Sequence, residues 1–135
     1  MNLLIDTNIV LEIILDQERA GEAQRLLANG PEHNFFISDF SLHSVGLFLF
    51  YRKQKNEFRF FLNDIIGKVG IKIKALPIED LETVIKVSEN FNLDFDDAYQ
   101  YVAAEKHQLT IVSFDTDFDR TKRGRKTPAQ ILAGK

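Results

Sequence analysis

The sequence contains no cysteine, and this absence excludes several classes of site at once. Disulfide scaffolds, thiolate zinc sites and cysteine nucleophiles all require that residue. The three histidines, His33, His43 and His107, are too scattered for a local metal-binding motif. No apolar run approaches the roughly 18 residues that a membrane helix needs, which predicts no membrane association. The first residues have no basic segment and reach a charge at Asp6, so we expect no signal peptide and a cytoplasmic location.

A surplus of basic residues is also missing, because 17 Lys and Arg residues face 20 Asp and Glu residues and the net charge is -3. Domains that bind nucleic acid over their whole surface are normally basic. The net negative charge therefore excludes this mode of nucleic-acid binding. The charges are nevertheless segregated. Residues 92–119 carry seven acids and one base, whereas residues 120–135 carry six bases and no acid. The separation of acidic and basic residues into adjacent segments suggests that each segment has its own role.

The length of 135 residues and the hydrophobic share of 44% predict one globular domain over residues 1–135 with a substantial core. Short apolar segments alternate with helical patterns, which is typical of an α/β fold with a central parallel sheet and helices on both faces. We expect about five strands, at residues 2–5, 35–37, 71–75, 109–112 and, in a more polar segment, 123–127. Lysines alternate with apolar residues in 71–75, which indicates an edge strand.

Aspartates follow two of the predicted strands. Asp6 comes directly after the first strand, Asp115 and Asp117 follow residues 109–112, and Asp97 lies in the first turn of a predicted helix. Each has a structural alternative as a helix cap, a residue favoured by the helix dipole, or a turn residue. Because the carboxyl ends of parallel strands meet at one edge of a sheet, however, we expect these side chains to gather there.

Gathered carboxylates repel one another unless a cation neutralises them. The natural neutraliser is a hard divalent cation with oxygen ligands, Mg²⁺ or Mn²⁺, whereas zinc is disfavoured because cysteine is absent and the histidines are scattered. A carboxylate-held Mg²⁺ without other catalytic groups suits phosphodiester hydrolysis.

Three motifs in this order resemble the PIN domain, and in particular the single-domain VapC-type toxins of bacterial toxin–antitoxin pairs. They are LLIDTN at residues 3–8, DDA at residues 96–98 and SFDTDF at residues 113–118. The resemblance covers essentially the whole chain. It implies a three-layer α/β/α fold, an Mg²⁺- or Mn²⁺-dependent ribonuclease, a homodimer, and a small antitoxin protein that blocks the site.

The resemblance also implies residue roles. Asp6, Asp97 and Asp115 match the acids that hold the metal, and Asp117 matches an additional catalytic acid. The supporting residues implied are those that orient the first aspartate and the hydroxyl residue before Asp115, namely Thr7, Asn8 and Ser113.

One position departs from the family. A Ser/Thr-Leu-x-Glu motif is usual after the second strand, but this chain has Ser41-Leu42-His43-Ser44, so that Ser44 stands in place of the glutamate. We therefore keep two hypotheses, a metal-dependent endoribonuclease and a catalytically weak or inactive module that binds RNA or a protein. A response-regulator-like domain is a third class, but its mid-chain phosphoacceptor aspartate and late lysine are not seen.

The basic C-terminal segment has two interpretations. It is either a solvated terminus or a set of phosphate-binding side chains beside the acids, since an acidic site repels RNA by itself. For the second, the candidate RNA-binding residues are Arg123, Arg125 and Lys126.

Overall fold

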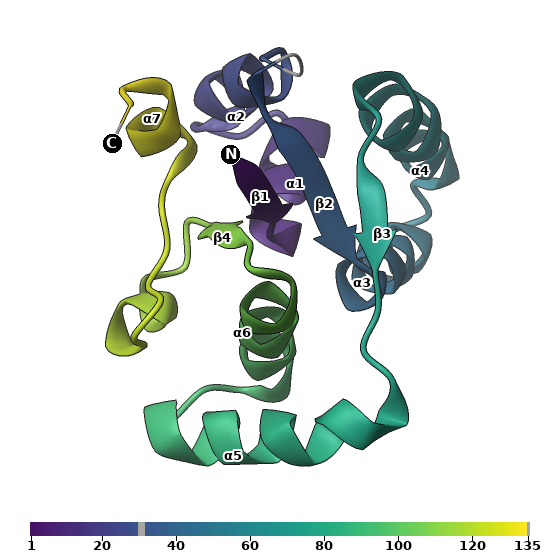
Figure 1. Cartoon of the computed structure of the whole chain (residues 1–135). Coiled ribbons are helices and arrows are strands. Elements are labelled where there is room, and N and C mark those ends of the chain that lie inside the picture. Colours follow the sequence, from purple (N-terminus) through teal and green to yellow (C-terminus); the bar gives the residue numbers. More distant parts are fainter. Residues whose placement is uncertain (30–31, 135) are drawn as a thin grey trace.

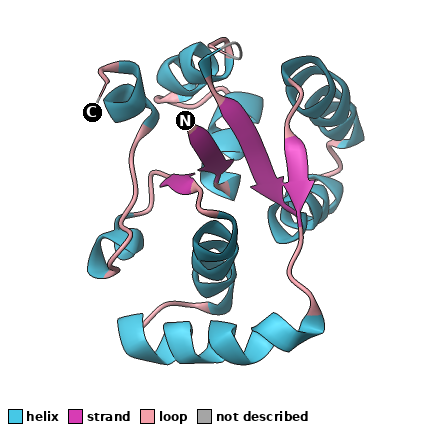
Figure 2. Cartoon of the chain, viewed as in Figure 1, coloured by secondary structure: helices cyan, strands magenta, loops and turns pink. Residues whose placement is uncertain are grey.

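A single parallel sheet organises the fold. The computed structural model describes residues 1–29 and 32–134, and its sheet has the strand order β3-β2-β1-β4 (Figures 1 and 2). The four strands are β1 (Asn2–Ile5), β2 (Asn34–Ser38), β3 (Lys72–Lys74) and β4 (Thr110–Val112). Every pairing is parallel. The predicted α/β class with a central parallel sheet is therefore confirmed, as is the position of the lysine-rich strand at an edge.

The fifth strand expected at residues 123–127 is reduced to one bridge. Val112 pairs with Lys126, whose backbone N–H donates to the carbonyl of Ile111 at 2.9 Å. The sheet thus has four strands rather than about five. Gly124 with a φ of +64° interrupts the extended backbone, and the segment is too polar to be buried against either core.

Helices cover both faces of this sheet. The α-helices are α1 (Thr7–Ile14), α2 (Ala20–Leu27), α3 (Asp39–Tyr51), α4 (Lys55–Phe60), α5 (Leu81–Phe91), α6 (Phe95–His107) and α7 (Pro128–Leu132). A π-helix (Phe61–Lys68) continues α4, and 3₁₀ turns occupy Ile78–Asp80 and Thr116–Arg120. In Figure 1, α5 and α6 lie together at the bottom, and α2, α4 and α7 at the top. The three layers implied by the resemblance are present.

The short helix α7 was not expected from the sequence. Its N-cap is Thr127, whose hydroxyl accepts from the backbone N–H of Gln130, while the Gln130 side chain accepts from the backbone of Thr127. This capping box, with Pro128 at the first helical position, stabilises one turn that hydrophobic periodicity over so few residues does not reveal.

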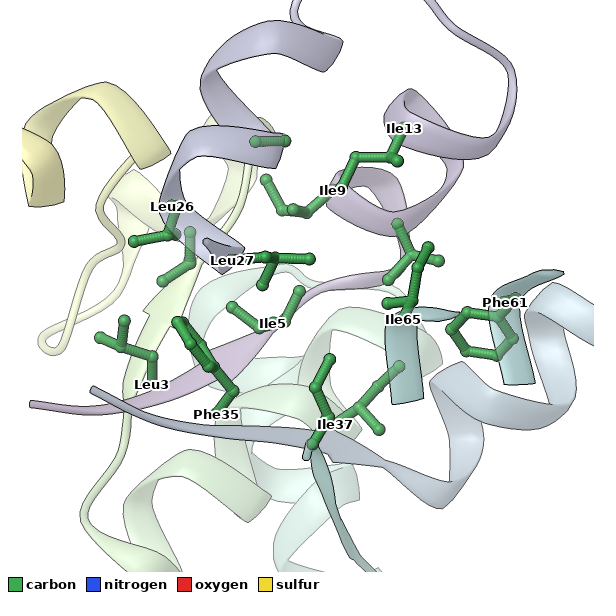
Figure 3. Close-up of a cluster of buried hydrophobic side chains, with 14 of the residues drawn as sticks. Leu3, Ile5, Ile9, Ile13, Leu26, Leu27, Phe35, Ile37, Phe61 and Ile65 are labelled. Atoms are coloured by element: carbon green, nitrogen blue, oxygen red, sulfur yellow. The ribbon is translucent and has the colours of Figure 1, made fainter. Parts of the chain in front are cut away.

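Alternation along the central strands builds two cores. Leu3 and Ile5 face α1, α2 and α3, and Figure 3 shows this cluster with Phe35 and Ile37 from β2. Leu4 faces the opposite cluster, which α5 and α6 complete. Because each fully buried Leu or Ile stabilises a fold by roughly 1.5–3 kcal/mol, β1 is fixed between two apolar layers and its carboxyl end is held rigidly. Within the described residues, the structure has no helix long and apolar enough to cross a membrane.

Candidate active site

Asp6 is the first acid of the site, and the chain surrounds it with donors. It caps α1 directly after β1, and its Oδ1 accepts from the backbone N–H of Thr7 at 2.8 Å and from Gln100 Nε2 at 3.0 Å. Its Oδ2 accepts from Ser113 Oγ at 2.7 Å and from Asn8 Nδ2 at 3.4 Å. The helix-cap role and the orienting role of Thr7, Asn8 and Ser113 therefore coexist in one geometry.

Burial is the main electrostatic influence on Asp6. It raises the pKa of the carboxyl, and the nearby charge of Asp115 raises it further, whereas the hydrogen bonds from Ser113, Gln100 and Thr7 lower it. The net direction is upward. An isolated buried carboxylate would be costly, so the four donors explain how Asp6 is tolerated at this depth.

Asp97 comes from the amino end of α6, next to the sheet edge. It is buried, and its pKa rises to about 8 because of burial first and then the charges of Asp96, Asp115 and Asp6. The helix dipole at this end favours a negative charge but does not offset that crowding. Binding of a cation among these carboxylates would relieve this crowding.

The segment after β4 supplies the remaining acids. Ser113 Oγ accepts from the backbone N–H of Asp115 at 2.9 Å, and Asp115 Oδ1 accepts from the backbone N–H of Asp117 at 2.9 Å. These two local bonds fold the segment back into the 3₁₀ turn Thr116–Arg120. Both carboxylates are half-buried and lie against α6.

Three of the predicted acids could share one ion. One carboxylate oxygen from each of Asp97, Asp115 and Asp117 lies within 4.8 Å of the other two. Among the described residues, this is the group of acids close enough to share an ion. The metal-binding set expected from the sequence is Asp6, Asp97 and Asp115, so the two sets differ by the exchange of Asp6 for Asp117. Asp117 is partly exposed and also pairs with Arg120 at 3.4 Å, whereas Asp6 is buried and lines the same cavity as Asp97 and Asp115.

The donor set suits a hard divalent cation. It consists of carboxylate oxygens, which Mg²⁺ and Mn²⁺ prefer, and it adds no histidine or thiolate. Burial and the neighbouring acids raise the pKa of Asp97, and the chain places a base beside the cluster, since Arg120 Nη1 lies 3.4 Å from Asp117 Oδ1. The residues present therefore fit such an ion, and the choice between Mg²⁺ and Mn²⁺ is open.

Four acids, Asp6, Asp96, Asp97 and Asp115, line a cavity of about 190 Å³, and Asp117 is not among its lining residues. Ser44 on α3 is part of its wall, so the position that replaces the family glutamate does face the acids. His43 is exposed and lies outside the lining, as expected for the neighbouring helical position. Phe40 also lines the cavity and contacts the Phe95 ring at a centroid distance of 5.7 Å.

Sequence reasoning missed Gln100 and Ser41. Gln100 is 2% exposed, lines the cavity and donates to both Asp6 and Ser41. One signal was available, since Gln100 follows Asp97 by three residues and so shares its helix face. Ser41 opens the Ser-Leu-His-Ser segment that resembles the family motif, but its contacts with Gln100 and Thr7 depend on the packing of α3 against α6 and α1.

The basic C-terminal residues lie elsewhere. Arg123 donates to the carbonyl of Leu109 at 3.0 Å, beside the amino end of β4 and away from the acids. Arg125 donates to both carboxylate oxygens of Asp119 and, at 3.1 Å, to the carbonyl of Ser113. With Lys126 they line a separate cavity of about 330 Å³ along β4. These side chains line this second cavity rather than the acidic one, because the chain pairs this segment with β4, and their role in RNA binding stays a prediction.

Comparison with known proteins places this geometry in a family. The family model described as PIN domain matches residues 3–124. Among curated proteins, none matches this sequence.

Solved structures of similar fold include a toxin–antitoxin complex, VapBC2 bound to DNA, and a toxin. A toxin–antitoxin complex from Klebsiella pneumoniae is 22% identical with a TM-score of 0.68, over 93% of this chain and 97% of that one. VapBC2 from Rickettsia felis, bound to a DNA fragment from its promoter, is 14% identical with a TM-score of 0.76 over the same shares. VapC20 from Mycobacterium tuberculosis, a toxin that cleaves the sarcin–ricin loop, is 19% identical with a TM-score of 0.73, over 87% and 92%.

These likenesses confirm the predicted fold over nearly the whole chain. Because the family model spans the first strand, the helix that carries Asp97 and the acids after β4, the chain belongs to the PIN domain family.

Proposed function

We propose that this protein is a metal-dependent endoribonuclease that hydrolyses RNA phosphodiester bonds. The observation that carries the proposal is the triad of Asp97, Asp115 and Asp117 oxygens within 4.8 Å, backed by the buried Asp6. A water bound to the ion would be the nucleophile, so no covalent intermediate is expected. The similarity of fold to a toxin that cleaves the sarcin–ricin loop supports RNA as the substrate.

In this proposal the residues of the site have different roles. Asp97, Asp115 and Asp117 would hold the ion, with Asp6 facing it from behind and Ser113, Asn8 and Thr7 orienting Asp6. Bound there, Mg²⁺ or Mn²⁺ lowers the pKa of a coordinated water and stabilises charge on phosphate oxygens. We expect RNA to lie across the mouth of the cavity, with a phosphate near the ion.

Amide substitutions test the assignment. Asp97→Asn, Asp115→Asn and Asp6→Asn should each abolish Mn²⁺-dependent cleavage of single-stranded RNA, because each removes a charge from the site while keeping its shape. The matched control is Asp64→Asn, whose carboxylate lies on the π-helix and pairs with Lys68 at 3.6 Å. Cleavage by all three site variants at the rate of the unmodified protein would refute the assignment.

An inactive RNA- or protein-binding module is the second candidate. The observation in its favour is Ser44, which lines the cavity where the family carries a fourth acid. It predicts RNA binding without cleavage at any Mg²⁺ or Mn²⁺ concentration. Retention of the three clustered acids favours the enzyme, since crowded carboxylates destabilise a fold that does not use them.

We further propose that the protein is the toxin of a toxin–antitoxin pair and acts in the cytoplasm. Similar folds occur in toxin–antitoxin complexes from several bacteria. Expression of the chain alone should stop bacterial growth, and co-expression of a small protein from the adjacent reading frame should restore it. Growth unaffected by the chain alone would contradict the proposal.

A homodimer is the proposed assembly of residues 1–135, which form one domain. The helix α3 exposes a stripe of large apolar side chains at helical spacing, Leu47, Phe50 and Tyr51, with exposed fractions of 74%, 52% and 91%. A contiguous patch of this kind is costly in water and is typical of a protein interface.

A further inference from the structure

Gln100 occupies a position where an apolar residue would be expected. It lies in the second turn of α6 among buried residues such as Ala98, Val102 and Ala103, and is itself 2% exposed. Its Oε1 is buried and, within the described part of the chain, has no hydrogen-bond partner. An unpartnered buried acceptor destabilises a fold, and an aliphatic side chain of similar size would avoid that cost. The presence of a glutamine here is therefore explained only if its amide nitrogen has a function.

That nitrogen joins two groups from different elements. Nε2 donates to Asp6 Oδ1 at 3.0 Å and to Ser41 Oγ at 2.8 Å. The orientation of the amide follows from this contact, because a carboxylate accepts and only the NH₂ group donates. Gln100 thus connects α6 to the end of β1 and to α3 at one point.

Ser41 completes the connection. Its Oγ also accepts from Thr7 Oγ1 at 2.8 Å, and the backbone N–H of Thr7 donates to Asp6. Asp6 is consequently held from α1 and from α6, while α3 is anchored to both through Ser41. Ser44 lies less than one turn further along α3 and brings no charge to the cavity.

We propose that Gln100 is a positioning residue, which holds the Asp6 carboxylate at the back of the acid cluster and anchors α3 there through Ser41. This inference rests on the proposed metal-dependent function. A carboxylate at position 44 would connect α3 to the acids by binding the same ion. In this chain the neutral amide of Gln100 connects α3 to Asp6 by hydrogen bonds and adds no charge. Hydrogen bonds from neighbouring residues to the groups that face a metal fix the orientation of those groups.

The test is Gln100→Met, which keeps the length of the side chain and removes the donor. Mn²⁺ binding, measured by calorimetry, should weaken about 10- to 100-fold, the usual effect of removing a hydrogen bond that orients a group facing the metal. The kcat for RNA cleavage at a fixed Mn²⁺ concentration should fall with it. The KM for RNA should not change, because Gln100 is buried beneath the mouth of the cavity.

Tyr99→Phe is the matched structural control. Tyr99 is the neighbouring residue of α6, and its hydroxyl donates to Asp39 at the start of α3 and accepts from the backbone of Leu76. The control therefore also removes a link between α6 and α3, but one that does not reach Asp6. It should lower the thermal midpoint and leave Mn²⁺ affinity unchanged.

Ser41→Ala keeps the proposal testable if Gln100→Met does not fold. It should weaken Mn²⁺ binding several-fold, and combined with Gln100→Met it should add no further loss, because both act through one network. Mn²⁺ affinities of Gln100→Met and Ser41→Ala equal to that of Tyr99→Phe would overturn the inference, as would an unmodified protein that binds no Mn²⁺. If Mn²⁺ binding depends on Gln100 but no RNA is cleaved, the inference stands and the proposed ribonuclease function fails.

Discussion

At the scale of single residues, Asp97 links the geometry of the site to stability. Its pKa rises from 3.8 to about 8 in the folded chain, so between about pH 4 and pH 8 the folded state keeps a proton that the unfolded state has released. The free energy of unfolding of the metal-free protein must then fall as pH rises through this window. We expect a lower thermal midpoint at pH 8 than at pH 5, measured by calorimetry in a chelating buffer.

Two comparisons isolate the cause of that pH dependence. Asp97→Asn removes the group and should flatten the dependence, because an amide does not titrate. Saturating Mn²⁺ should raise the midpoint more at pH 8 than at pH 5, since the ion binds the ionised carboxylates. A dependence of equal steepness in Asp97→Asn would assign it to other groups.

Ser44 allows the missing charge to be restored. Ser44→Glu should tighten Mn²⁺ binding, because affinity at hard-cation sites rises with the number of charged oxygen ligands. It should also lower the midpoint of the metal-free protein through added repulsion. The measurements are Mn²⁺ calorimetry and thermal unfolding with and without the ion.

The control for Ser44→Glu is His43→Glu, one position earlier on α3. Adjacent helical residues point about 100° apart, and His43 is exposed outside the cavity, so this variant should bind Mn²⁺ as the unmodified protein does. Tighter binding by both variants would indicate a general effect of negative charge and would remove the special role of position 44.

At the scale of elements, residues 121–127, between the 3₁₀ turn and α7, pack along β4 and hold it in place through hydrogen bonds. The Arg125 side chain is only 14% exposed and donates to Asp119 and to the carbonyl of Ser113. Arg125→Ala should therefore destabilise the protein by roughly 1–3 kcal/mol, mostly through the buried carbonyl left without a donor rather than through the exposed carboxylate. Urea unfolding measures this change.

Lys122→Ala is the control for Arg125→Ala, because Lys122 is exposed in the same segment. It should leave the urea midpoint unchanged. If Arg125→Ala instead kept full stability and lost affinity for single-stranded RNA, the phosphate-binding interpretation of the C-terminal residues would be the correct one.

At the scale of the whole molecule, the exposed stripe on α3 predicts the oligomeric state. Leu47→Asp combined with Tyr51→Asp should convert a dimer into a monomer in sedimentation equilibrium, since a charge in an apolar interface is strongly unfavourable. Ile78→Asp is the control, because Ile78 is 78% exposed on a different surface, beside α5. A monomeric unmodified protein would refute the assignment of this face.

Local patterns in the sequence predicted the class of fold and the principal acids. Short apolar runs that stop at Asp6 and shortly before Asp115 mark buried strands, because a charge cannot continue into the core. Parallel strands end at one edge, so the gathering of Asp6, Asp97, Asp115 and Asp117 followed from topology. The lysines of residues 71–75 likewise identified an edge strand, and the structure confirms this position.

Contacts between distant segments decided what the sequence by itself did not determine. Asp117 joins Asp97 and Asp115 because a turn folds back through two backbone bonds, and Asp6 is held in place by donors from positions as distant as Gln100 and Ser113. Arg125 is bound within the chain because residues 123–127 return to β4. Such choices depend on which donors and acceptors the packed layers bring within about 3 Å, and no local pattern in the sequence contains that information.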